Sequence, residues 1–271
     1  MPVANQKPKD ESSSSDSSDS EVEGIDLTGN HSDGGPPDLD SSDDDSGPLE
    51  VTFEFRDPTE DYFGSIRTLL RDFPCACNLG ELSGAIAEQS KIGTLVCQEE
   101  REDVFSFISV LNLGPHKKLE SLEQIRSFLL SKVPSGKEAF WQGILKSKTA
   151  GLLFRGQLLN FPPQLVPNLH ASLLNDVSWA AENTEDEEEE LDFQFENFVF
   201  LARYSELNSG KGGSSSEGGS GVIYDNFDDE VLANSASKSF RFDCDNTSFL
   251  VGTIDFKSYQ NAVDTMKRLI S

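Results

Sequence analysis

Histidine and cysteine are the side chains of this sequence that could serve as metal ligands, general bases or nucleophiles. The chain has three histidines, His31, His116 and His170, and four cysteines, Cys75, Cys77, Cys97 and Cys244. The histidines lack the H-x-x-x-H and H-E-x-x-H spacings of zinc hydrolases. The cysteines form neither a disulfide framework nor a C-x-x-C pair. We therefore expect reduced structural thiols, as in cytosolic or nuclear proteins. The alternative is a metal site that joins Cys75 and Cys77 to histidines.

Phosphate-binding and nucleophile motifs are also absent from the sequence. No P-loop, G-x-S-x-G elbow or G-x-G-x-x-G turn follows a predicted strand. The glycine-rich stretch 209–221 is interspersed with serine, which is typical of a flexible loop. Carboxylates are abundant, but they gather in tails and loops, where we expect nothing to raise their pKa. The sequence therefore predicts a non-enzymatic protein with no catalytic residue, no metal and no cofactor.

The charge balance of the chain is strongly acidic. There are 48 Asp and Glu against 22 Lys and Arg, which gives a formal net charge of −26. This disfavours direct nucleic-acid binding, because phosphate contacts require Lys and Arg. Basic proteins such as histones or ribosomal proteins suit an acidic surface, and the alternative is that acidity only keeps the chain soluble. No apolar run approaches the ~20 residues of a membrane span, and no secretory signal is recognisable.

Residues 1–48 have the composition of a disordered tail. The first 50 residues hold 14 acidic residues, two lysines and no aromatic residue, a net charge of −12. Such a segment cannot bury enough apolar surface to offset its ordering entropy. Within it, Ile25, Asp26, Leu27 and Thr28 resemble a SUMO-interacting motif that would add as a strand to a sheet edge, and the alternative is an unused linker. Five serines precede an acidic residue by three positions, as acidophilic kinase sites do: Ser13, Ser18, Ser20, Ser41 and Ser42.

A second acidic run covers residues 182–190. It carries seven negative charges and no positive one. We predict that it forms a loop whose carboxylates steer cationic clients toward the folded part of the chain. The residues proposed for this steering role are Glu185, Asp186, Glu187, Glu188, Glu189 and Glu190.

Residues 49–271 have the hydrophobic pattern of a single α/β domain. Val51, Phe53 and Phe55 alternate with polar residues, which is typical of a half-buried strand. The strand predicted over 104–113 is apolar on both faces and should be central. Further strands are predicted over 92–97, 152–154, 193–204 and 249–256, with helices after residues 57, 78, 121, 140 and 162 and at the C-terminus. This order predicts a mixed, largely antiparallel sheet flanked by helices.

Two segments of the chain resemble the BCCIP family, Glu102–Leu113 and Gly151–Leu165. The second contains the fairly specific stretch Asn160-Phe161-Pro162-Pro163-Gln164, and Lys91-Ile92-Gly93-Thr94 precedes both at the expected place. The resemblance spans about residues 50–271 and implies a fold related to the GCN5-type acetyltransferases. No Q/R-x-x-G-x-G/A signature for acetyl-CoA follows a strand in this chain.

The resemblance also implies a function. It implies a nuclear adaptor and chaperone for a basic ribosomal protein of the large subunit, which supports ribosome biogenesis and nuclear export, with roles in DNA repair and cell-cycle control in animals. Partners expected on this basis are basic proteins and, in addition, recombination and cell-cycle proteins. Two alternatives remain: an acetyltransferase-like protein, degenerate or active, and a recombination or cell-cycle scaffold without chaperone activity.

Overall fold

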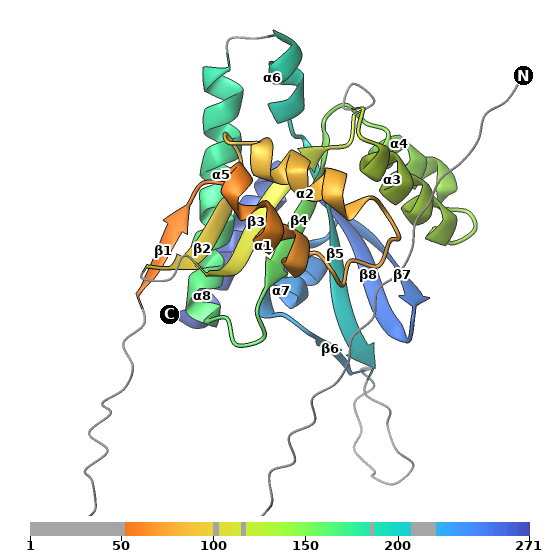
Figure 1. Cartoon of the computed structure of the whole chain (residues 1–271). Helices are drawn as coiled ribbons and strands as arrows, with labels where there is room; N and C mark the ends of the chain where they lie inside the picture. Colours follow the sequence, from red (N-terminus) through yellow and green to blue (C-terminus); the bar gives the residue numbers. More distant parts are fainter. Residues whose placement is uncertain (1–51, 100–102, 115–117, 185–186, 207–220) are drawn as a thin grey trace, which may run out of the picture. The chain divides into compact units, whose positions relative to one another are not determined.

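A mixed sheet forms the centre of the structure, a computed structural model that describes residues 52–271 apart from 100–102, 115–117, 185–186 and 207–220 (Figure 1). Within these residues the strands lie in the order β1-β2-β3-β4-β5-β8-β7, and β6 pairs with the end of β5. Their bounds are β1 Phe53–Arg56, β2 Thr94–Gln98, β3 Val104–Asn112, β4 Ala150–Gln157, β5 Asn197–Glu206, β6 Val222–Tyr224, β7 Lys238–Cys244 and β8 Thr247–Asp255. Described neighbours pair antiparallel except β4 and β5, which are parallel. The predicted mixed, largely antiparallel sheet is confirmed.

Helices cover both faces of this sheet. One face carries η1 Glu60–Tyr62, α1 Phe63–Leu69, α2 Leu79–Glu88, α3 Glu120–Lys132 and α4 Glu138–Leu145. The other carries α5 Val166–Asn183, which follows η2 Pro163–Leu165, together with α7 Phe227–Ser235 and α8 Phe256–Ile270. Each layer buries its own hydrophobic cluster against the sheet, so the fold has three layers. Among the described residues, no helix is long and apolar enough to cross a membrane.

The strand β3 lies inside the sheet, as its sequence predicts. It pairs with β2 on one side and with β4 on the other. Phe107 points into the core under α1–α4, and its neighbour Ile108 points into the core under α5, α7 and α8. Because both faces of this strand are covered, both alternating sets of side chains are apolar.

The C-terminal helix α8 follows from a simple amphipathic pattern. Tyr259, Val263 and Met266 recur at helical spacing and are all buried. Asp255 caps the helix, since its carboxylate accepts a 2.9 Å hydrogen bond from the backbone N–H of Ser258. This helix places the Tyr259 hydroxyl in the interior of the protein.

The acidic run 182–190 is not the loop that its charge predicts. Glu182 lies in the last turn of α5, which ends at Asn183. A further helix, α6, spans Glu187–Phe193 and so includes the last four glutamates of the run. Glutamate is a good helix former, and carboxylates are favourable in a first helical turn because of the helix dipole. Phe193 is buried and anchors the end of α6.

The elements between residues 222 and 244 were not predicted from the sequence. Here the structure contains β6, α7 and β7. In β7, Phe240 and Phe242 are buried, while Arg241 between them and Asp243 after them are exposed. The period of two that marks a strand is therefore present, although only over a few residues.

Candidate functional site

The two parallel strands at the centre of the sheet separate along their length. The ladder between β4 and β5 joins Ala150–Leu152 to Asn197–Val199 and ends there. Beyond that point Arg155 on β4 spans the gap, and its Nη2 donates a 3.1 Å hydrogen bond to the backbone oxygen of Leu201 on β5. Crevices between parallel strands are frequent ligand sites, so what occupies this gap decides what it can bind.

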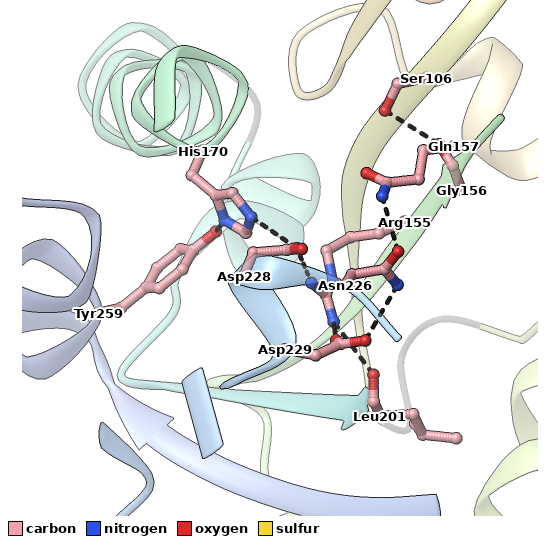
Figure 2. A network of polar contacts seen from close by, with 10 residues as sticks. All are labelled: Ser106, Arg155, Gly156, Gln157, His170, Leu201, Asn226, Asp228, Asp229 and Tyr259. Carbon is pink, nitrogen blue, oxygen red and sulfur yellow. Dashed lines mark hydrogen bonds and ion pairs between the residues drawn. The ribbon is translucent and has the colours of Figure 1, made fainter. Parts of the chain in front are cut away.

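Two carboxylates from α7 close the gap around Arg155 (Figure 2). The guanidinium donates to Asp228 through Nη1 and to Asp229 through Nη2. Both aspartates are at most 4% exposed. Asn226 donates to Asp229 over 3.0 Å and accepts from Gln157 over 2.6 Å. Arg155 thus bridges two carboxylates, with one charge-assisted hydrogen bond to each, and such bonds are stronger than those between neutral groups.

His170 on α5 and Tyr259 on α8 extend the network into the core. The His170 Nε2 atom lies 3.1 Å from Asp228, and Nδ1 lies 2.6 Å from the Tyr259 hydroxyl. Asp228 is an acceptor, so Nε2 carries the ring proton and Nδ1 accepts from the tyrosine. The network thus joins β4, α5, α7 and α8 through side chains and reaches β5 through the backbone oxygen of Leu201 (Figure 2).

The charges of the network follow from burial and pairing. Burial opposes ionisation of Asp228, but Arg155 and His170 outweigh it and hold the pKa of Asp228 below its usual range. Burial raises the pKa of Asp229 to about 6 despite the attraction of Arg155. Burial lowers the pKa of His170 and raises that of Tyr259, so both are neutral at physiological pH. Asp229 lies in the helix α7, outside the tails and loops in which carboxylates are expected to keep their usual pKa.

The network is placed to hold the fold together, because its imidazole and phenol are inaccessible. His170 and Tyr259 are 1% and 0% exposed. Arg155 and Asp229 line a cavity of about 130 Å³, whose lining includes neither His170 nor Tyr259 among the described residues. A substrate at that cavity would meet an arginine and a carboxylate that are already paired. This geometry supports a structural role better than acid–base catalysis.

A half-buried carboxylate, Asp176, ties α5 to the other end of the sheet. Asp176 accepts hydrogen bonds from the backbone N–H of Gly93 over 3.2 Å and from the Thr94 hydroxyl over 3.4 Å. Burial raises the pKa of Asp176 to about 6. Gly93 and Thr94 belong to the motif 91–94, which is part of the resemblance to the BCCIP family. The motif is therefore a docking point for α5.

Most of the predicted site residues fall outside the part of the chain that the structure describes. This applies to the SUMO-like motif Ile25–Thr28, to the five tail serines, to His31 and His116, and to Glu185 and Asp186 of the acidic run. Glu187, Glu188 and Glu189 lie in α6. Glu190 is half-buried and accepts a 2.9 Å hydrogen bond from Gln194. The roles assigned to these residues stay predictions.

The cysteines are all thiols in the structure. Cys75 and Cys97 are buried, and Cys77 and Cys244 are half-buried. In the described part of the chain, no group of three or more His, Cys, Asp or Glu side chains could hold a metal ion.

The buried network was not found from the sequence, although two signals pointed to it. Arg155 is a single charge inside the apolar strand β4, and Asp228-Asp229 lie between Phe227 and the apolar pair Val231-Leu232. Charged residues are almost never fully buried unless they are paired. Which arginine meets which carboxylate depends on contacts about 73 residues apart, and the sequence does not specify them.

Comparisons with known proteins agree on one family. Residues 48–232 match the BCCIP family. The chain is 30% identical to the protein BCCIP homolog of Arabidopsis thaliana, over 82% of this chain and 71% of that protein. It is 28% identical to protein bcp1 of Aspergillus oryzae, over 64% and 61% of the two chains.

Solved structures are similar to this chain at the level of the fold. The crystal structure of BCP1 from Saccharomyces cerevisiae matches with a TM-score of 0.60 at 19% identity, over 86% of this chain and 96% of that one. N-acetyltransferases also match in outline, among them Arabidopsis thaliana NAA60, with a TM-score of 0.37 at 10% identity. The family match and the similarity to the Arabidopsis protein together show that this chain belongs to the BCCIP family.

Proposed function

We propose that this chain is a non-enzymatic adaptor or chaperone that binds basic protein clients, with ribosomal proteins of the large subunit as the main candidates. The observation that carries the proposal is the distribution of its charge. The net charge is −26, of which −12 lies in residues 1–50 and −7 in residues 182–190. Long-range attraction by such segments raises the rate at which cationic partners arrive, while the folded surface selects among them.

The acidic run stands at a prominent position on the folded part. Figure 1 shows the end of α5 and the helix α6 standing beyond the top of the sheet. Trp179 is 54% exposed there, and Glu182 follows it by one turn of α5. An exposed indole beside a carboxylate is suited to Arg and Lys side chains, through cation–π contact and charge attraction. The end of α5 therefore offers a basic client an aromatic contact in addition to negative charge.

The buried network supports the non-enzymatic part of the proposal. In an acyltransferase the space between diverging parallel strands would have to admit a ligand. Here Arg155 spans that space and is held by Asp228 and Asp229. The acetyltransferase alternative would require this network to open. Saturable binding of acetyl-CoA in calorimetry would favour that alternative, and absence of heat would count against it.

Nuclear localisation, support of ribosome biogenesis and nuclear export, and roles in DNA repair or cell-cycle control belong to the same proposal. Family membership supports them, as does the preference of an acidic surface for basic proteins. A scaffold for recombination or cell-cycle proteins without chaperone activity would have partners that need not be basic. Affinity purification of the full chain followed by mass spectrometry separates the two, because the chaperone proposal requires basic proteins to dominate the set.

The direct test measures binding of the full chain to purified large-subunit ribosomal proteins and to core histones. We expect at least one of them to bind, with an affinity that falls as salt rises from about 50 to 300 mM, mainly through a lower association rate. An unrelated acidic protein of similar size and charge serves as the control. The proposal fails if no basic protein binds this chain more tightly than it binds the control.

A further inference from the structure

A groove runs along the outer side of α2. Its first part has a volume of about 540 Å³ and lies between α2, η1 and the start of α1. It is lined mainly by small and apolar residues of α2, by Phe63 of α1 and by Leu119, which precedes α3. Figure 1 shows α2 in front of the sheet, with α1 on one side of it and α6 on the other.

The groove continues toward the acidic helix α6. A second cavity of about 280 Å³ shares Ala85, Glu88 and Leu119 with the first. Its far wall includes Asp192 and Phe193 of α6. The two cavities therefore adjoin one another between η1 and α6, and together we call them the α2 groove.

The floor of the α2 groove is open because α2 carries small residues there. Gly80 and Gly84 are one helical turn apart, and both line the groove. A Cβ atom added at Gly84 would meet only the end of the Glu88 side chain, at 3.9 Å. An added methyl group would fit at this position, so packing around the Cβ position does not require glycine. Small residues at such spacing let the axis of another helix come close, within the usual range of about 8–10 Å.

The rim of the α2 groove is acidic. Glu60, Glu81, Glu88 and Asp192 line it, against the single lysine Lys91. Glu81 is held in its ionised form, because it accepts backbone hydrogen bonds from Ser121 and Glu120, which lower its pKa. The ammonium group of Lys91 lies over the ring of Phe193 and donates a hydrogen bond to the Thr184 hydroxyl. The positive charge of Lys91 therefore lies at the end of the groove next to α6.

We infer that the α2 groove binds an amphipathic helix of a basic client, with the apolar side of that helix on Gly84, Phe63 and Leu119 and its Lys or Arg side chains on the acidic rim. Helix-in-groove recognition needs an apolar floor and a charged rim of complementary sign, and the groove has both. Its end at α6 would also place the client beside the acidic run. This inference rests on the proposed function, since it names the surface that would recognise the basic client.

A pair of designed peptides tests the inference with the full chain. One is an 18-residue helix-forming peptide, of about five turns, with Leu on one side and Lys on the other. The second has the same composition with the Leu residues spread around the helix. We expect the first peptide to bind at least about tenfold more tightly than the second, because only the first presents an apolar side to the floor. Equal binding of the two peptides would mean recognition by charge alone and would overturn the inference.

Two variants of the chain test the location of binding. Gly84→Leu fills the floor, and the pair Glu60→Lys with Glu88→Lys reverses the rim. We expect each to weaken binding of the amphipathic peptide at least about tenfold. The matched controls are Gly143→Leu in α4, where an added Cβ also meets nothing within 4 Å, and Asp264→Lys on α8. They should bind like the wild type, and urea unfolding of every variant checks that the fold is intact.

The same variants are then tested with the basic protein that binds the wild type most tightly. Weakened binding in the groove variants and not in the controls supports the inference. Unchanged binding in all variants overturns the α2 groove as the site and leaves the proposed function standing. If the wild type binds no basic protein at all, the proposed function itself fails.

Discussion

Arg155 on β4 and Leu201 on β5 are joined by a side-chain hydrogen bond at a place where the two strands no longer pair through their backbones. The arginine thereby replaces the missing ladder and satisfies a carbonyl oxygen that would otherwise face the gap. Its charge in turn fixes Asp228 and Asp229 of α7 against the sheet. One residue thus connects the central strands to the helical layer behind them.

Loss of the Arg155 charge should destabilise the protein strongly. Arg155→Met keeps most of the side-chain volume but leaves Asp228 and Asp229 buried without their cation. We expect a loss of about 3–5 kcal/mol in the free energy of unfolding, measured by urea titration. Adding Asp228→Asn and Asp229→Asn to Arg155→Met should recover part of that loss, because no unpaired charge then remains. A loss below about 1 kcal/mol in the single variant would contradict the role given to the network.

The pH dependence of stability should report on His170. Burial keeps the pKa of His170 below 6.5 in the folded chain, whereas the unfolded chain takes up a proton near 6.5. Stability from His170 is therefore lost as pH falls below about 6.5, by at most about 1.4 kcal/mol per pH unit. Asp229 and Asp176 act in the opposite direction. Their raised folded pKa of about 6 means that protonation stabilises the fold as pH falls from about 6 toward 3.8.

The variant His170→Gln isolates the histidine from the two aspartates. Glutamine can still bond to Asp228 and Tyr259 but does not titrate. We expect the stability advantage of the wild type over His170→Gln to shrink between about pH 7 and pH 5, as measured by urea unfolding at each pH. A constant difference across this range would show that His170 is not held neutral in the folded protein.

The sheet and most helices could be predicted from the sequence. Single elements show why some of them were predictable and others were not. β3 was predictable because both of its faces are covered, so Phe107 and Ile108 are both apolar. The helix α6 was not predictable, since a block of like charges is typical of a solvated segment. The burial of Phe193, which anchors the end of this helix, is a tertiary contact. The long-range partners of Arg155 and His170 were not predictable either. Their positions depend on the packing of α7 and α8, which no local pattern encodes.

Among the glycines that the structure describes, Gly93 combines a positive φ with close packing, so its replacement should both strain the backbone and crowd its neighbours. Its φ is +125°, and an added Cβ would lie 3.0 Å from both Pro58 and Ser109. Gly93→Ala should therefore lower the free energy of unfolding by about 1–3 kcal/mol and weaken the hydrogen bond to Asp176. Gly84→Ala is the matched control, because that site is helical and roomy, and it should raise stability by about 0.5–1 kcal/mol. Equal effects of the two substitutions would contradict this account of the motif 91–94.

Thiol reactivity should separate the four cysteines, because their surroundings differ. Cys77 is half-buried, and its pKa is lowered because the Cys75 thiol donates a hydrogen bond to it. The same contact and burial raise the pKa of Cys75. Since the thiolate is the reactive form, an aromatic disulfide reagent should modify Cys77 first in the native full chain, and the buried Cys75 and Cys97 last.

Single serine variants assign the kinetic phases of that reaction. Cys77→Ser should remove the fastest phase. Cys244→Ser should remove a slower one, because the Cys244 thiol donates weakly to the Pro74 carbonyl. Persistence of the fastest phase in Cys77→Ser would show that the thiol pair does not lower the pKa of Cys77. In that case exposure alone would set the order, and Cys77 and Cys244 would react at similar rates, since both are half-buried.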